Sequence, residues 1–208
     1  SLSGVFDDGG TISTWVYPVS AGANHIGRIV DKSNNLSGGW TLRCAGEYGA
    51  YIKLAFFHKF TNTDGLWTTD AVLPLSTWSH VILTYNSTTS ANDPVVYVNG
   101  DATTLTESSA PSGQPNTDRT FDMYIGNTAT TQSSGTFDGS IGEVKMFNRY
   151  FDVDEVTNLH RGKEVDYRHL GAKQDILTSG TLEIGKWYRI NEFKSTDNFM
   201  TVGAPSNA

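Results

Sequence analysis

Residues 75–103 carry the clearest pattern of apolar and polar positions in the chain. Both faces of the extended segment 78–85 are largely apolar, which predicts a strand that is buried on both sides. A second apolar run, 94–98, leads into Asn99 and Gly100, a pair typical of a type I′ turn because both central residues need a positive φ. A third strand is expected over 101–105. This stretch is therefore predicted to form the central hairpin of a β-sandwich.

Shorter alternating runs, separated by turns rich in Gly, Asn, Asp and Ser, extend along most of the chain and favour a sandwich of short strands. We expect these strands over residues 1–6, 10–17, 26–30, 40–45, 51–57, 66–73, 121–126 and 137–149. The polar stretch 106–118 is predicted to be a long loop. Asp152 and Glu155 have the spacing of a capping box, which predicts a short helix that reaches about His160 and is ended by Gly162.

Two sequence motifs carry a family resemblance. The motif W-x-H-V-x-x-T-Y at 78–85, followed by V-Y-V-N-G at 96–100, resembles the core of laminin-G-like domains. These domains belong to the concanavalin-A-like lectin and glucanase jelly rolls, and residues 10–18 and 137–149 resemble the first and last strands of the family. The resemblance covers about residues 1–162 and implies an all-β fold, an antiparallel jelly-roll β-sandwich.

The C-terminal part of the chain differs in character. Residues 163–176 are charged and polar and are interpreted as a linker. Residues 177–208 resemble a small β module of bacteriophage tail, fibre and other virion proteins, through a Gly-Lys turn at 185–186 and an acidic-Phe-x-x-Val-Gly pattern at 197–203. The module usually continues beyond this pattern with a further strand, so we expect it to be incomplete here.

Composition agrees with this organisation. The 208 residues suit one sandwich with a small appendage, and abundant Gly, Ser, Thr and aromatic residues favour an all-β class. The net charge of −7 argues against nucleic acid as a partner, and no apolar run approaches the roughly 20 residues that cross a bilayer. The N-terminal residues lack the pattern of a signal peptide. Cys44, the only cysteine, is predicted to be a small core residue.

Catalysis is not expected. The retaining glycoside hydrolases of the superfamily need two carboxylates about 5 to 5.5 Å apart, which a Glu-x-Asp-x-Glu strand supplies. The sequence has no such run; Asp152, Asp154 and Glu155 lie at a predicted helix start, and Glu47 stands alone in a turn. The histidines have no recognisable metal-ligand spacing either. His80, at a position that the resembling family also fills with histidine, is expected to have a structural role.

Calcium is the one ion that the resemblance implies, because many members of the group bind it through loop carboxylates. The candidate ligands are Asp7, Asp8, Asp138 and Glu143, from two segments that such folds often bring together. Gly142 stands where the family commonly has an aspartate, which removes one ligand. The alternative is that these aspartates only stabilise turns through hydrogen bonds to the backbone.

A sugar-binding surface would need exposed aromatic rings beside polar side chains. Tyr48, Tyr51 and Trp67 are the candidates, because they lie in or beside turns rich in Gly, Asp and Asn. The alternative for each is a structural role. The three tryptophans within strand patterns are expected in the core: Trp15, Trp40 and Trp78.

Two functions from different classes follow. The first is a non-enzymatic structural, decoration or adhesion protein of a phage virion, whose partners are other virion proteins, copies of itself and a host-surface glycan. The alternative is a secreted, extracellular carbohydrate-binding module of a larger polysaccharide-active protein. Neither function involves nucleic acid or membrane insertion. The genes beside the full-length gene would discriminate between the two.

Overall fold

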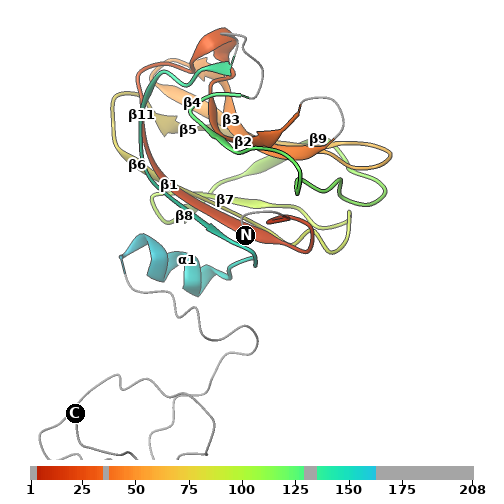
Figure 1. The fold of residues 1–208 in the computed structure, drawn as a ribbon. Helices are drawn as coiled ribbons and strands as arrows, with labels where there is room; N and C mark the ends of the chain where they lie inside the picture. Colours follow the sequence, from red (N-terminus) through yellow and green to blue (C-terminus); the bar gives the residue numbers. More distant parts are fainter. Residues whose placement is uncertain (1–3, 35–37, 129–134, 163–208) are drawn as a thin grey trace, which may run out of the picture. The chain divides into compact units, whose positions relative to one another are not determined.

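The structure, a computed structural model, describes residues 4–34, 38–128 and 135–162. These residues form two antiparallel β-sheets that pack face to face (Figure 1). Sheet A has the strand order β11-β1-β6-β7-β8, and sheet B has the order β10-β2-β3-β4-β5-β9. The predicted all-β antiparallel sandwich is therefore confirmed. The predicted linker 163–176 and small β module 177–208 lie outside the described residues.

Strands distant in the sequence lie side by side in sheet A. Strand β1 pairs with β6 on one edge and with β11 on the other. The bounds in sheet A are β1 Gly10–Pro18, β6 Ser79–Tyr85, β7 Val95–Val98, β8 Asp101–Ala102 and β11 Gly139–Phe147. Those in sheet B are β2 Arg28–Ser33, β3 Gly39–Tyr48, β4 Tyr51–His58, β5 Gly65–Pro74, β9 Leu105–Ser109 and β10 Tyr124–Ile125. A short 3₁₀ turn, η1, spans Ala23–His25.

The predicted central hairpin is confirmed. Strand β6 lies between β1 and β7, and all of its residues are buried. Asn99 and Gly100 have φ values of 54° and 92°, as a type I′ turn requires. The third strand is shorter than predicted, because β8 ends at Ala102 and the chain then crosses to sheet B.

The polar stretch 106–118 was predicted to be a loop, and this prediction is wrong for 106–109. These residues belong to β9, which pairs with β5 at the edge of sheet B. Edge strands are often polar because charged and polar side chains discourage pairing of the free edge with another strand, and in β9 only Leu105 packs against the core. Its pattern therefore lacks the apolar alternation of an inner strand.

The first predicted strand is also absent in the described part of 1–6. Residues 4–7 form a turn in which the Asp7 N–H donates to the Gly4 carbonyl over 3.1 Å, and Val5 and Phe6 are buried in the core. Phe6 packs edge-on against Trp40, with ring centroids 5.0 Å apart. Two apolar residues here fill the sandwich from a turn rather than from a strand.

Strand β2 runs two to three residues later than predicted, through the polar residues Lys32 and Ser33. Lys32 is nevertheless buried, because its ammonium donates to the carbonyls of Asp118 and Phe121 over 2.7 Å each and lies 3.8 Å from the Asp118 carboxylate. Asp118 also accepts from the Trp40 indole over 2.7 Å. This buried polar network holds the segment before β10 against the sandwich.

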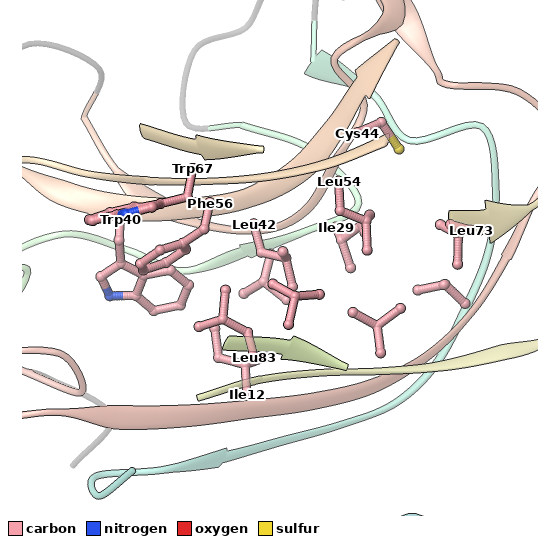
Figure 2. Packing of buried hydrophobic residues seen from close by; sticks show 14 of the residues in the cluster. Ile12, Ile29, Trp40, Leu42, Cys44, Leu54, Phe56, Trp67, Leu73 and Leu83 are labelled. Carbon is pink, nitrogen blue, oxygen red and sulfur yellow. The ribbon is translucent and has the colours of Figure 1, made fainter. Parts of the chain in front are cut away.

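The main hydrophobic core fills the space between the two sheets (Figure 2). Inward-facing side chains of sheet B, such as Leu42, Leu54 and Phe56, meet Ile12 and Leu83 from sheet A. Cys44 is buried among them, as predicted, and burial raises the pKa of its thiol to about 12. Such a thiol stays protonated at neutral pH and acts as a small apolar group.

The predicted helix is present as α1, Val153–His160, and its capping box is confirmed. The Glu155 N–H donates to the Asp152 carboxylate over 2.9 Å, and the Asp152 N–H donates to the Glu155 carboxylate over 3.1 Å. Val156 and Leu159 pack against Ile82 in a second cluster on the outer face of sheet A (Figure 1). No helix within the described ranges is long and apolar enough to cross a membrane.

Candidate functional site

Helix α1 covers only part of the outer face of sheet A, and three aromatic side chains occupy a neighbouring part. Trp15 is 37% exposed, Trp78 is 48% exposed, and Tyr17 is partly exposed. We call Trp15, Tyr17 and Trp78 the aromatic shelf. Large rings that remain in water on a sheet surface are unusual enough to indicate an interaction site.

The alternation of β1 places the shelf on this face. Ile12 and Val16 point into the core, so Trp15 and Tyr17 point outward. The pairing between β1 and β11 shifts at this point, from Thr14 opposite Val144 to Val16 opposite Ile141. The β-bulge leaves Trp15 opposite two residues of β11, and bulges of this kind re-aim side chains.

Gly142, one of these two residues, lies beside both tryptophans. A Cβ atom at Gly142 would lie 3.1 Å from Cβ of Trp15, a tight contact, and 3.6 Å from the ring of Trp78. Trp78 precedes β6, so its side chain must extend across β1 to reach β11. Its ring centroid is 5.8 Å from that of Tyr17, with the two rings tilted by 53°. Trp78 therefore lies across β1 with about half of its surface exposed.

His80 supports the shelf from the neighbouring strand. Its ring stacks on that of Trp15, with centroids 4.8 Å apart and an angle of 5°, and its Nε2 lies 2.8 Å from Ser13 Oγ. The pKa of His80 is lowered to about 4, chiefly by burial and also by the charges of His160 and Lys145, whereas the charge of Glu143 acts in the opposite direction. The His80 ring is therefore neutral at physiological pH.

The structure brings His160 next to His80, which the sequence spacing did not indicate. His160 is the last residue of α1, and its Nδ1 lies 3.0 Å from Nδ1 of His80. The two residues are 80 positions apart, and only the packing of α1 on sheet A joins them. No local motif could have predicted this pair.

The shelf suits a ligand with both apolar and polar faces. A flat indole can cover the apolar face of a pyranose ring, while nearby polar side chains bind its hydroxyls. Such polar side chains border the shelf: Ser140 lies opposite Tyr17 in β11, Glu143 and Lys145 follow in the same strand, and the exposed Thr77 precedes Trp78.

Two of the three predicted ligand-binding aromatics are exposed. Tyr48 and Tyr51 are 55% and 48% exposed and lie opposite each other at the turn between β3 and β4. The Lys53 ammonium lies 4.9 Å from the centre of the Tyr48 ring. Tyr51 also pairs with Pro74, and the Ser76 N–H donates to the Pro18 carbonyl, so this hairpin and the shelf border the same end of the sandwich.

The third candidate, Trp67, does not fit a binding role. The side chain is fully buried against Phe56 and Tyr85, and its indole N–H donates to Asp93 over 2.8 Å (Figure 2). The turn that made Trp67 a candidate lies before β5, and the alternation of the strand then directs the ring inward. Trp67 is a core residue.

For the tryptophans within strand patterns the prediction failed in the opposite direction, since two that were expected in the core are exposed. Trp40 is buried, as predicted, but the core positions predicted for Trp15 and Trp78 are wrong. Both were assigned to the core because they lie in apolar strand patterns. Helix α1 buries the apolar part of the outer face of sheet A around Ile82 and Tyr97, and the part that carries Trp15 and Trp78 lies beyond it.

The four predicted calcium ligands are not brought together. Asp7 and Asp8 precede β1, whereas Asp138 precedes β11, and the antiparallel register places Asp138 beside the far end of β1. Asp7 instead accepts from Arg119 over 2.9 Å, and Asp138 accepts from the Ser20 hydroxyl over 2.7 Å. Glu143, in the middle of β11, pairs with Lys145 at 3.0 Å. Across the described ranges, no group of three or more His, Cys, Asp and Glu side chains could hold a metal ion.

A family model described as the concanavalin A-like lectin/glucanases superfamily matches residues 3–157. This range contains both sheets and the whole aromatic shelf. A search of curated protein sequences gave no match.

Solved structures with the same fold include proteins of distant sequence. The native heptameric SAP-like pentraxin of Limulus polyphemus is 12% identical, with a TM-score of 0.55 over 74% of this chain and 70% of the pentraxin chain. The CBM40 of the Ruminococcus gnavus IT-sialidase, bound to alpha2,3 sialyllactose, is 14% identical, with a TM-score of 0.53 over 74% and 83%. At these identities the likeness shows the fold alone.

Proposed function

The chain belongs to the concanavalin A-like lectin/glucanases superfamily, and from this premise we propose that it is a carbohydrate-binding module whose aromatic shelf binds a glycan. One observation carries the proposal: the Trp78 indole lies across β1, beside Gly142 and Tyr17, and Trp78 is 48% exposed. An aromatic ring that already lies on the sheet surface offers a flat apolar face on which a sugar can stack.

Each member of the shelf has a distinct role in this proposal. Trp78 provides the main stacking surface, and Tyr17 extends it along β1. Trp15, fixed by its stack on His80, forms the side of the shelf toward α1. Hydroxyl groups of the sugar would bind Thr77, Ser140 and the charged pair Glu143–Lys145 at the border.

One fold relative supports the proposal by its own ligand. The bacterial CBM40 is described in complex with a sialylated sugar, so this type of sandwich can present a glycan site. Loops and surface side chains determine the ligand on such a scaffold, and the fold does not transfer a sugar specificity. The sugar bound here is therefore to be found by screening.

We propose that this binding is non-enzymatic, because the sequence lacks the strand with paired carboxylates of the retaining glycosidases. Two biological settings fit a glycan-binding sandwich: an extracellular module of a polysaccharide-active protein, and an adhesion protein of a phage virion. The virion setting depends on the pattern within residues 177–208, which lie outside the described residues, and stays a prediction. The family and the fold relatives support the carbohydrate-binding setting more directly.

The proposal is tested by screening the protein on a glycan array and measuring the best ligand by isothermal titration calorimetry. Trp78→Ala should weaken binding at least tenfold, the change that corresponds to about 1.4 kcal/mol. Tyr150→Ala is the matched control, because Tyr150 is a 50% exposed aromatic that lies between β11 and α1, away from the shelf.

A double variant, Tyr48→Ala with Tyr51→Ala, separates the shelf from the second exposed aromatic pair. If this double variant loses binding while Trp78→Ala retains it, the site lies on the β3–β4 hairpin and the shelf assignment is wrong. If Tyr150→Ala is as harmful as Trp78→Ala, the shelf assignment is likewise wrong. If no glycan on the array binds, the proposed function itself is refuted.

A further inference from the structure

The contact between His80 and His160 offers a second kind of site. The two Nδ1 atoms lie 3.0 Å apart, so one imidazole donates a hydrogen bond to the other through these atoms. An imidazole pair that shares one proton in this way has two ring nitrogens within reach of the same ion. Imidazole nitrogen is the commonest protein ligand for transition metals.

The separation fits coordination to one ion. With metal–nitrogen bonds of about 2.0–2.1 Å, two imidazoles bound to one ion have nitrogens roughly 2.9 Å apart at a right angle and roughly 3.4 Å apart at a tetrahedral angle. The observed 3.0 Å lies between these values. The ring centroids are 5.3 Å apart and the ring planes differ by 25°, so the two Nδ1 atoms face each other directly. Both rings must therefore turn before their lone pairs converge on one ion that replaces the shared proton.

The surroundings of His80 match those of a metal ligand. A ligating histidine usually donates its second ring N–H to a nearby acceptor, which fixes the tautomer and the ring orientation. Ser13 Oγ lies 2.8 Å from Nε2 of His80 and can accept that hydrogen bond. The His80 backbone N–H also donates to Asn99 Oδ1 over 2.8 Å, which fixes the main chain at the same residue.

His160 has the freedom that the second ligand needs. It is partly exposed at the end of α1, while the preceding Leu159 is buried against sheet A. The backbone of His160 is thus held close to His80, and its partly exposed ring lies between His80 and Gly100, 6.3 Å from the Trp15 ring between centroids. The site opens to solvent on the side of His160, which gives an ion a path to enter.

We propose that His80 and His160 form a two-histidine site for a divalent first-row transition-metal ion that prefers imidazole, Zn²⁺, Ni²⁺ or Cu²⁺. Both rings bind through Nδ1, the shared proton moves to Nε2, and each ring stays neutral. No third His, Cys, Asp or Glu of the described ranges completes the site, so water fills the remaining positions. A site with two protein ligands is weak, and its affinities follow the order Cu²⁺, then Ni²⁺ and Zn²⁺.

This inference does not depend on glycan binding, and its test uses metal ions alone. The full chain is titrated with zinc chloride by isothermal titration calorimetry at pH 7.5 and, separately, with copper chloride while tryptophan fluorescence is recorded. Copper bound at His80 should quench Trp15, whose ring stacks on His80 with centroids 4.8 Å apart. We expect one ion per chain with an affinity in the micromolar range.

His160→Ala should weaken binding at least tenfold without unfolding the protein, since His160 is partly exposed at a helix end. His80→Gln is the second variant, and circular dichroism shows whether each variant is folded. His25→Asn, at an exposed histidine in η1, is the matched control and should leave the affinity unchanged. His169→Ala, outside the described residues, tests whether another histidine contributes. Unchanged zinc affinity in folded His160→Ala, or no binding by the wild type at millimolar zinc, would overturn the proposal.

Discussion

His58 is a buried histidine whose replacement should change how stability depends on pH. It points inward from β4 and is 1% exposed among aromatic rings; the nearest, that of Phe60, has its centroid 4.9 Å away. Within the described residues its Nδ1 has no hydrogen-bond partner. Burial lowers the pKa of His58 from 6.5 to about 4, although the charges of Asp7 and Asp64 act in the opposite direction.

The sign and size of the effect follow from proton linkage. As the pH falls below 6.5, the unfolded chain takes up a proton at His58, whereas the native state stays neutral until about pH 4. The unfolded state is therefore favoured increasingly across this window. A pKa difference of about two and a half units corresponds to about 3 kcal/mol lost between pH 6.5 and pH 4.

The test substitution is His58→Leu, which replaces the imidazole by an apolar side chain of similar size and so removes the titrating group. The free energy of unfolding is measured with urea at several pH values from 7.5 to 4 for the wild type and the variant. Contributions of the carboxylates and of His80 occur in both proteins and largely cancel in the difference. The stability of the variant relative to the wild type should rise by about 3 kcal/mol as the pH falls to 4.

The matched control is His25→Asn, at an exposed histidine with a φ of 61°, a conformation that Asn tolerates. Its curve should run parallel to that of the wild type. If the curve of His58→Leu is also parallel to the wild type from pH 6.5 to 4, the native state binds the proton as readily as the unfolded chain. The argument from burial would then be refuted.

Two further predictions concern the buried polar network and the helix. Lys32→Met should lower the free energy of unfolding, measured with urea, by about 3–5 kcal/mol, because it leaves the Asp118 carboxylate buried without its cation. The control is Lys59→Met, which removes a more exposed ion pair with Asp64 and should lower the free energy of unfolding by less than about 1 kcal/mol. Equal losses in the two variants would contradict the assignment. Asp152→Ala should cost about 1 kcal/mol by removing the capping box of α1, measured by urea unfolding, and an unchanged midpoint would show that the cap does not contribute.

Elements whose signals are local could be predicted from the sequence. The turn at Asn99 and Gly100 and the capping box at Asp152 each depend on a few consecutive residues, and both are present as predicted. Strand β9 and the end of β2 could not be predicted, because their polar residues are acceptable only through partners far away in the chain. Lys32, for example, is satisfied by carbonyls near residue 120.

The candidate site was missed for the same physical reason. Whether Trp15 and Trp78 are core or surface residues depends on how much of sheet A the helix α1 covers, and no strand pattern contains that information. Trp67 was misplaced because a turn before it suggested exposure, although its own strand directs it inward. The pairing of His80 with His160 likewise requires the tertiary packing of α1.

The position of β1 also has a consequence for synthesis of the protein. On the ribosome β1 emerges well before its two neighbours, since Thr11 pairs with both Thr84 and Phe147. One edge of β1 therefore stays unpaired in the nascent chain until β6 has emerged, and the other until β11 has left the exit tunnel. Long-range pairing of this kind slows folding and exposes strand edges to aggregation. Production at low temperature or with chaperones should therefore raise the soluble yield.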